Sequence, residues 1–226
     1  MIPASRPRAA ATGYCRAAVP PRKAASQMSD SSNTSTPSPV TARGPGKRER
    51  LIVAAAELLH QQGVERTTLA EIAAAAGVPL GNVYYHFKTK DDLVAAVVAD
   101  HTATAEASLA AITARFSSPR QRLAAFLSGL ACRADAVAAH GCAHGSLCSE
   151  LGKRPAGRGP GSATLLTVPI DWVEAQFREM GLPECRELAV SLLASYQGIS
   201  LIANTLHDPG VFTREIRRLQ QWVDGL

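Results

Sequence analysis

Aromatic residues are scarce in this chain of 226 residues, at 5%, and no stretch reaches the roughly 18–20 consecutive apolar residues of a membrane-spanning helix. No segment alternates apolar and polar residues as a half-buried strand does. Alanine and leucine dominate instead, which favours helix over strand. The sequence therefore predicts an all-α protein with a sizeable core and no membrane partner.

The motifs of common enzyme classes are also missing. The segment Gly145-Ser146-Leu147 lacks the G-x-S-x-G frame of a nucleophile elbow, and neither a phosphate loop nor a dinucleotide fingerprint is present. We predict that the chain is not an enzyme and has no cofactor.

Cysteine is irregular in number and spacing, which excludes a disulfide framework. The five are Cys15, Cys132, Cys142, Cys148 and Cys185. The N-terminus has no apolar core of a secretory signal. We therefore expect reduced thiols and a cytoplasmic location.

Acidic residues are nearly absent from the first 50 positions, which carry nine Lys and Arg against two Asp and Glu. This balance of +7 exceeds the +5 of the whole chain, so the remainder sums to −2. Any binding to a polyanion must come from a local surface rather than from overall charge. Residues 1–45 lack periodicity and predict a disordered tail. Their composition also fits a transit peptide, and Met28 is an alternative start.

Helical periodicity begins at Lys47. It predicts helices over 47–62, 68–75, 79–87 and 91–116, and then over 119–139, 143–151, 164–181, 184–206 and 212–224. The Gly- and Pro-rich segment 152–161 predicts irregular structure.

The most informative stretch is TTLAEIAAAAGVPLGNVYYHFKTKDDL, residues 67–93. It predicts two short helices joined by a tight turn at Gly77, completed by the helix 47–62 into a three-helix domain over 46–92. The second short helix and its exit present side chains suited to phosphate contacts, and its N-terminus can enter a major groove. The outward residues are Gly81, Asn82, Tyr84, Tyr85, His86, Lys88 and Lys90.

This stretch closely resembles the helix-turn-helix of the TetR family of transcriptional regulators. The resemblance implies that phosphates are held by Thr67, Asn82, Tyr84, Tyr85, His86 and Lys90. It places Pro79, Leu80 and Gly81 at the base-facing start of the recognition helix, and we add Thr68 to the expected DNA-binding set. Family members often carry a polar residue near Leu80, so contact with a thymine methyl is the alternative there.

Residues 93–226 predict a larger helical domain for ligand binding and dimerisation. The segment from His140 to Leu151, with the pattern GCxxGSLxxEL, resembles the LmrA/YxaF-like branch of TetR regulators. The helices 184–206 and 212–224 are expected to form a four-helix bundle in a homodimer, with Gly198 allowing close approach.

A ligand pocket is expected between the long helix after Asp91 and the bundle. Its predicted lining is Phe126, Leu147, Ile170, Trp172, Phe177 and Tyr196, with Asn204 as a polar anchor. This lining predicts an apolar or aromatic inducer.

Cys142 has three interpretations. It follows a glycine at a predicted helix N-terminus, so it could sense oxidants or electrophiles with Cys148 as a resolving thiol. It could pack the helix start as a small buried residue. With His140, His144 and Cys148 it could ligate a metal, but that spacing is too compact for a recurring zinc pattern, and we predict no metal.

The sequence thus predicts a ligand-responsive repressor that binds double-stranded, near-palindromic operator DNA as a homodimer. The alternatives are a thiol-based sensor through Cys142 and Cys148, and a DNA-binding regulator without an inducer.

Overall fold

The structure, a computed structural model, describes residues 46–154 and 161–226, and within them every regular element is an α-helix. The described helices are α1 (Lys47–Gln62), α2 (Leu69–Ala76), α3 (Leu80–His86), α4 (Lys90–Arg115), α5 (Pro119–Ala131), α6 (Ala134–His140), α7 (Ala143–Gly152), α8 (Thr164–Glu179), α9 (Cys185–Leu206) and α10 (Pro209–Asp224). The all-α prediction is confirmed, whereas the predicted disordered tail, 1–45, lies outside the described residues.

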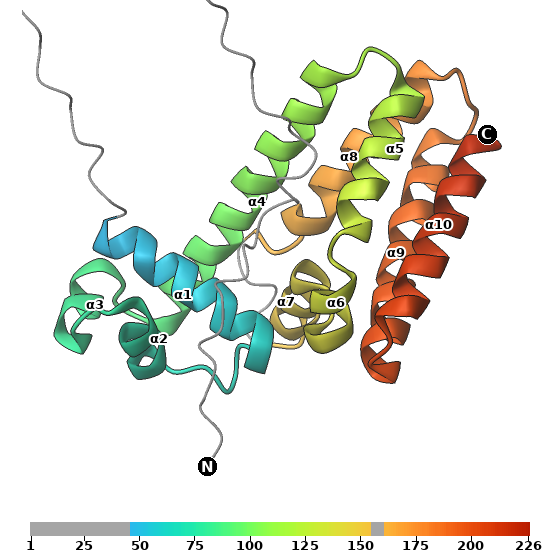
Figure 1. Cartoon of the computed structure of the whole chain (residues 1–226). Coiled ribbons are helices and arrows are strands. Elements are labelled where there is room, and N and C mark those ends of the chain that lie inside the picture. Colours follow the sequence, from blue (N-terminus) through green and yellow to red (C-terminus); the bar gives the residue numbers. More distant parts are fainter. Residues whose placement is uncertain (1–45, 155–160) are drawn as a thin grey trace, which may run out of the picture.

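Helices α1, α2 and α3 form a three-helix head, seen at the left of Figure 1. Leu51, Ile72 and Val83 are almost fully buried at its centre. A capping box joins Thr68 and Glu71 at the start of α2, in the sequence pattern T-x-x-E that marks such a start. Gly77 ends α2 with φ of 60°, a left-handed conformation that favours glycine, so the chain can turn sharply into α3.

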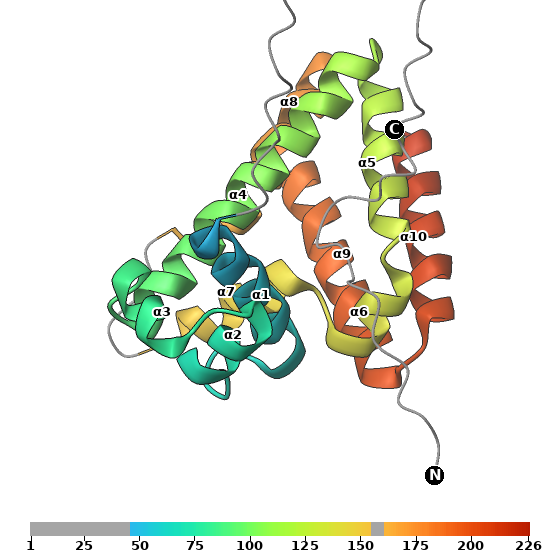
Figure 2. The same ribbon diagram turned by 60° about the vertical axis from the view of Figure 1, so that its left-hand side comes forward.

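The remaining helices form the body, and α4 joins it to the head (Figures 1 and 2). The N-terminal half of α4 packs into the core of the head, and Leu109 near its other end belongs to the core of the body. Helix α9 packs against both α8 and α10. The body core includes the fully buried side chains Leu123, Phe126, Phe177, Leu192, Phe212 and Ile216.

The short helices α6 and α7 lie between the head and α9 (Figures 1 and 2). Leu147 and Leu151 of α7 are buried in the same core as the head. The head therefore rests on α7 as well as on α4.

The single helix predicted over 119–139 is wrong, because the chain breaks between Ala131 and Ala134. There the amide of Arg133 bonds to the carbonyl of Leu130, a tighter spacing than that of an α-helix. The break lets α6 turn and pack against α9 and α10. No glycine or proline marks it, so tertiary packing decides it.

Helix α10 begins at Pro209, three residues before its predicted start at 212. The carboxylate of Asp208 accepts hydrogen bonds from the amides of Gly210 and Val211, at 2.7 and 3.3 Å. An aspartate N-cap followed by proline at the first helical position is a recognisable start signal that the apolar periodicity alone misses.

Within the described residues, α9 is long and apolar enough, by length and average hydropathy, to cross a bilayer. Polar residues interrupt its apolar residues, so the sequence analysis, which looks for an uninterrupted apolar run, does not predict a membrane span there. Core helices of soluble proteins pass the same test. Because α9 packs on α6, α8 and α10, we interpret it as a core helix with one uncovered face.

Candidate nucleic-acid interface and internal cavity

Helix α3 presents an unusual surface for a short helix. Val83 and Phe87, 0 and 3% exposed, anchor it to the head. Leu80, Tyr84 and Tyr85 on its other side are 43, 48 and 81% exposed. Large apolar and aromatic side chains gathered outward on one helix indicate a contact surface for a partner.

The other residues predicted near α3 complete this surface. Pro79, Gly81 and Lys88 are exposed, and Asn82 and His86 are half-buried. The ring of His86 lies edge-on to that of Tyr85, with centroids 5.1 Å apart. The ammonium of Lys88 donates to the carbonyl of Tyr84 at 3.0 Å, which keeps the charge beside the two tyrosines.

Thr67 and Lys90 do not lie free on this surface. Thr67 is fully buried, and its hydroxyl donates to the carbonyl of Gly63 at 2.7 Å. The phosphate contact predicted for this hydroxyl is therefore not available to it in the folded head. Thr68 remains exposed at the start of α2, where its hydroxyl donates to the carboxylate of Glu71 at 2.7 Å.

Lys90 binds backbone carbonyls of the loop between α1 and α2. Its ammonium donates to Val64, Glu65 and Thr67, at 2.8, 3.3 and 3.1 Å. Lys90 is the first residue of α4, where the helix dipole disfavours a positive charge. The three carbonyls supply the compensating negative potential, so this lysine fastens the loop to α4.

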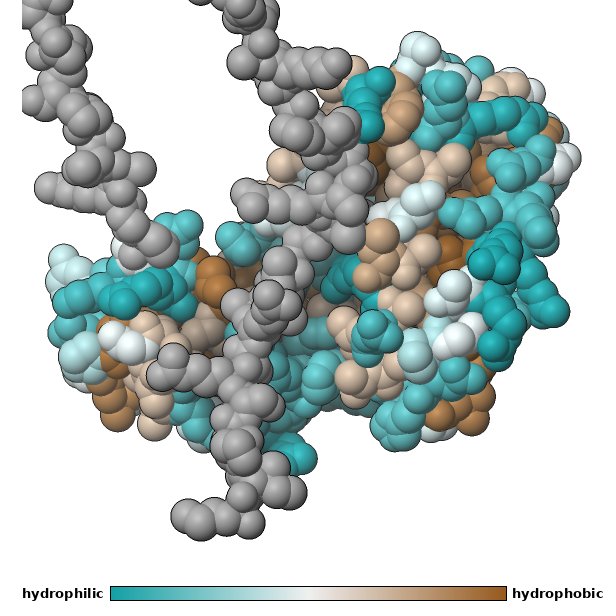
Figure 3. Space-filling model, viewed as in Figure 1, coloured by the Kyte–Doolittle hydropathy of each residue, from teal (hydrophilic) through white to brown (hydrophobic). Residues whose placement is uncertain are grey.

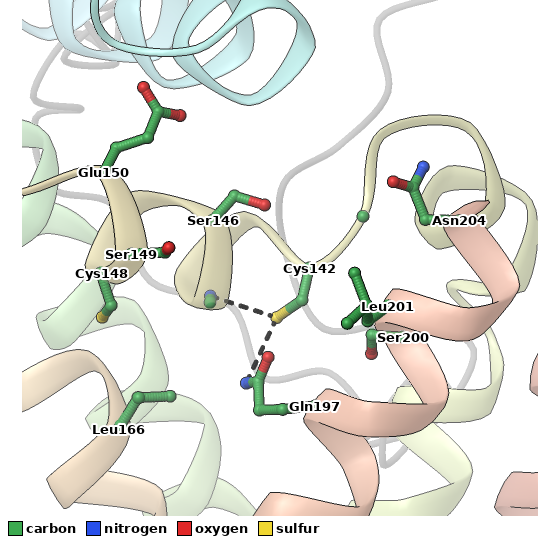
Figure 4. Close-up of a pocket in the computed structure, with 12 residues that line it drawn as sticks. Cys142, Ser146, Cys148, Ser149, Glu150, Leu166, Gln197, Ser200, Leu201 and Asn204 are labelled. Atoms are coloured by element: carbon green, nitrogen blue, oxygen red, sulfur yellow. Dashed lines mark hydrogen bonds between the residues drawn. The ribbon is translucent and has the colours of Figure 1, made fainter. Parts of the chain in front are cut away.

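A cavity of about 690 Å³ lies between α7 and α9 (Figure 4). Its walls carry mainly small and hydrogen-bonding side chains. The lining is Gly141, Cys142, Gly145, Ser146, Cys148, Ser149, Glu150, Leu166, Gln197, Ser200, Leu201 and Asn204. Glu150 supplies its one ionisable carboxylate, and none of these residues is Lys or Arg.

The sulfur of Cys142 is central to this cavity (Figure 4). Cys142 is the N-cap of α7, and its Sγ accepts from the amide of Gly145 at 3.5 Å and from Nε2 of Gln197 at 3.6 Å. Cys148 differs, because its thiol donates to the carbonyl of Ser162 at 3.1 Å and burial raises its pKa to about 11. Cys148 is therefore poorly suited to the predicted role of a resolving thiolate.

Of the predicted ligand-binding residues, Cys142 and Asn204 line the cavity. The others lie elsewhere. Phe126, Phe177 and Tyr196 are buried in the body core, Ile170 and Trp172 pack against it, and Leu147 belongs to the core of the head. The predicted lining relied on aromatic residue type, whereas the space is created by Gly141, Gly145 and nearby serines.

Residues at the cavity contact the head directly. The imidazole of His60 in α1 donates from Nε2 to the carbonyl of Gly141 at 2.9 Å, and the amide of Val64 donates to the carboxylate of Glu150 at 2.6 Å. Arg154, just beyond α7, pairs with Glu65 at 3.0 Å. The N-terminal end of α7 therefore borders the cavity, while Glu150 and Arg154, at and just beyond its other end, bind the loop after α1.

A second hollow, of about 630 Å³, opens on the outer side of α9 and α10. Its lining is Ser191, Ser195, Gly198, Ile199, Ile202, Glu215, Arg218, Leu219 and Trp222. Ile202 of α9 and Trp222 of α10 are 52 and 37% exposed. Leu201 and Leu206, also in α9, are 67 and 60% exposed. Figure 3 shows apolar atoms at the lower end of this helix pair, beside a hydrophilic outer surface.

The described residues include no group of three or more His, Cys, Asp or Glu placed to hold a metal ion. His140, Cys142, His144 and Cys148 therefore do not form a metal centre in this part of the chain.

Comparison with known proteins finds a family match within the head and the start of α4. Residues 51–97 match the model of bacterial regulatory proteins of the tetR family. The chain is 52% identical over 46 residues to the HTH-type transcriptional regulator AcrR of Shigella flexneri, covering 20% of this chain and 21% of that protein. It is 39% identical over 51 residues to the HTH-type transcriptional repressor BepR of Brucella suis, covering 23 and 24%. These matches thus span about a quarter or less of the relatives' length.

The fold of the described residues is similar to that of a TetR transcriptional regulator from Legionella pneumophila. The TM-score is 0.71 at 21% identity, over 80% of this chain and 97% of that one. This match confirms the predicted fold, a helix-turn-helix head on a larger helical body. The matched relatives are transcriptional regulators by name.

Proposed function

We propose that this chain, a transcriptional regulator of the TetR family, is a homodimeric repressor that a small molecule releases from operator DNA. The observation that carries the proposal is the outward face of α3, with Leu80, Tyr84 and Tyr85 exposed on a helix that Val83 and Phe87 hold in place. Such a helix can enter the major groove with its N-terminus and contact phosphates with its hydroxyls. Because operator DNA is cytoplasmic in bacteria, we place the protein there.

The dimer would use the outer face of α9 and α10. Ile202 and Trp222 leave apolar surface uncovered, and Gly198 lies in the groove between them. A second copy related by a two-fold axis would bury this face and pair the helices in a four-helix bundle. Two heads related in this way read half-sites about one helical turn apart, so the operator is expected to be a near-palindrome.

Replacing Tyr85 with phenylalanine tests the DNA contact. The variant removes one hydroxyl from a side chain that is 81% exposed, so the fold should not change. A dimer loses two hydrogen bonds to phosphate, which at about 0.7 kcal/mol each corresponds to roughly tenfold weaker binding. We expect this loss for the operator and for unrelated DNA alike, measured by fluorescence anisotropy after the operator has been selected from random duplexes.

Leu80→Ala is the matched comparison, because Leu80 lies at the base-facing end of α3. This variant should change the sequence preference rather than the affinity for unrelated DNA. Unchanged operator affinity in Tyr85→Phe together with unchanged preference in Leu80→Ala would remove α3 from the interface and contradict the proposal.

The effector site in this proposal is the cavity between α7 and α9. A ligand there would press on the segment from Gly141 to Glu150, whose two ends hold His60 and Val64 of the head. Its lining favours an uncharged ligand with hydrogen-bonding groups, because the carboxylate of Glu150 is already bonded to the amide of Val64 and the other described lining residues are neither acidic nor basic. The apolar inducer that the sequence predicts would therefore also carry hydrogen-bonding groups. The cavity also gives the GCxxGSLxxEL segment a role, which supports the LmrA/YxaF-like branch.

The position of Cys142 favours a second candidate, a sensor of electrophiles. Its sulfur lines the cavity and accepts two N–H groups, so a small molecule in the cavity can meet it. The thiolate would add to an activated alkene by forming a C–S bond, while the alkene electron pair moves to the neighbouring carbon and takes up a proton. Cys148 has no part in this route, which needs a single thiol.

N-Ethylmaleimide tests the cavity without knowledge of the natural inducer. Addition at Cys142 places a bulky group in the cavity, and we expect operator affinity to fall at least tenfold, by displacement of α7. Peptide mass spectrometry identifies the modified thiols, and Cys142→Ser is the control that should keep its affinity. If the control loses affinity equally, the effect comes from another cysteine, such as the exposed Cys132, and the cavity is not the effector site.

A further inference from the structure

Four of the six histidines of the chain meet where the head joins the body. His60 belongs to α1, His101 to α4, His140 to the end of α6 and His144 to α7. The rings of His60 and His140 lie edge-on with centroids 5.6 Å apart, and those of His101 and His144 are 5.2 Å apart. We call His60, His101 and His144 the junction histidines, since His140 is exposed to solvent.

His101 is buried without any hydrogen-bond partner among the described residues. It is 8% exposed, and neither Nδ1 nor Nε2 is satisfied. Beside it lies a cavity of about 10 Å³ lined by Ala56, Leu59, His60, Val97, His101, Ala143 and Leu147. That space admits at most about one water molecule, which is too little to hydrate an imidazolium. A buried imidazole left unpaired costs stability, so an apolar residue would serve packing better.

The surroundings oppose a positive charge at the junction. Besides the histidines of α1, α6 and α7, the charged groups that face it are Arg133, between α5 and α6, and Asp100, on α4. Burial is the largest cause that lowers the pKa of His101, and Arg133 and His60 lower it further, while Asp100 raises it. Burial and these neighbouring bases lower the pKa of His144 to about 3. The pKa of His60 is also lowered, chiefly by burial.

We propose that the junction histidines make the contact between head and body sensitive to protons, so that mild acid opens it. The rings fit the closed junction only as neutral imidazoles, and they take up protons once α1 moves away and water reaches them. Because the pKa values of these rings are lowered in the closed state, the neutral rings stabilise the closed junction at a pH above the ordinary histidine pKa of about 6.5. This stabilisation is lost as the pH falls below that value. This inference goes beyond the proposed response to an inducer and does not depend on it.

Hydrogen exchange of the full chain at pH 7.5 and 5.5 tests the proposal directly. The amides to follow lie in 59–65 and 143–151, on the two sides of the junction, after correction for the intrinsic effect of pH. Each ring that is neutral when closed and has a pKa near 6.5 when open raises the opening equilibrium about tenfold between these pH values. The hydrogen bond from His60 to the carbonyl of Gly141 offsets part of the effect of its burial, so only His101 and His144 are counted. With these two rings we expect about a hundredfold rise, while peptides of α9 and α10 stay protected.

His101→Leu should reduce this pH effect from about a hundredfold to about tenfold, because one of the two rings is removed. His140→Gln is the matched control, since His140 is exposed to solvent and is not one of the junction histidines, so its replacement should leave the pH effect unchanged. Equal pH dependence in the native chain and in His101→Leu would overturn the proposal.

A second measurement keeps the test independent of that variant. In the native chain, NMR titration of the imidazole carbons should show that His101 takes up its proton only as the junction opens. An ordinary titration of His101 with unchanged protection of 59–65 would refute the proposal. Neither measurement uses DNA, so their failure leaves the repressor proposal untouched.

Discussion

Replacing Ile202 with arginine is expected to leave each protomer folded and to weaken operator binding about a thousandfold. Ile202 is 52% exposed in the groove between α9 and α10, so arginine fits the isolated chain. In the proposed dimer two such arginines would face each other near the two-fold axis, beside Arg218 of each groove. Uncompensated charge at the centre of an apolar interface separates the copies. One head then binds one half-site, without the effective concentration that its partner provides.

Light scattering after size exclusion measures the mass of the variant, and anisotropy measures its binding to the operator. Ala107→Arg is the control, because it adds the same charge at an exposed position of α4 away from the groove. It should remain dimeric and bind DNA normally. A dimeric Ile202→Arg variant with full affinity would show that α9 and α10 do not form the interface.

Lys90→Met is expected to lower the free energy of unfolding of the head by about 3 kcal/mol. The substitution keeps most of the aliphatic side chain and removes the ammonium that binds the carbonyls of Val64, Glu65 and Thr67. The loop after α1 then loses its connection to α4, and operator binding is lost with it. Both tryptophans, Trp172 and Trp222, lie in the body, so unfolding of the head should be followed by hydrogen exchange or by circular dichroism.

Lys88→Met distinguishes the two roles that a lysine can have here. Lys88 is exposed and contacts one carbonyl, so its loss should leave stability unchanged and lower the salt dependence of DNA binding by about one unit per lysine. If Lys90→Met behaved in this way instead, Lys90 would be the phosphate ligand that the sequence predicts, and the structural role would be wrong.

The head is predictable from its sequence because its signals are local. A capping box at Thr68, a left-handed glycine at Gly77 and apolar positions such as Val83 each specify one feature, and the structure has all three. The body is less predictable, because its decisive features are tertiary. Nothing in the sequence near Cys132 announces the break between α5 and α6, which follows from packing on α9 and α10.

The cavity escapes prediction for a related reason. Aromatic residues such as Phe126 and Phe177 suggest a binding pocket by their chemistry, but large apolar side chains fill space and therefore form the core. A cavity arises where side chains are too small to meet across a gap. The run from Gly141 to Ser149 carried that signal through its glycines and serines, which periodicity analysis ignores.

The continuity of α4 determines how far a small movement in the body can reach. Its 26 residues span about 39 Å, and no glycine or proline interrupts them between the body core and the head. A helix of this kind turns as a rigid rod, so a tilt of about 5° at its far end carries the other end through roughly 3 Å, which is the length of the rod times the angle. In the proposed dimer, two heads displaced in opposite directions would change their separation by twice that amount. That would be enough to bring the two copies of α3 out of step with successive grooves of one duplex.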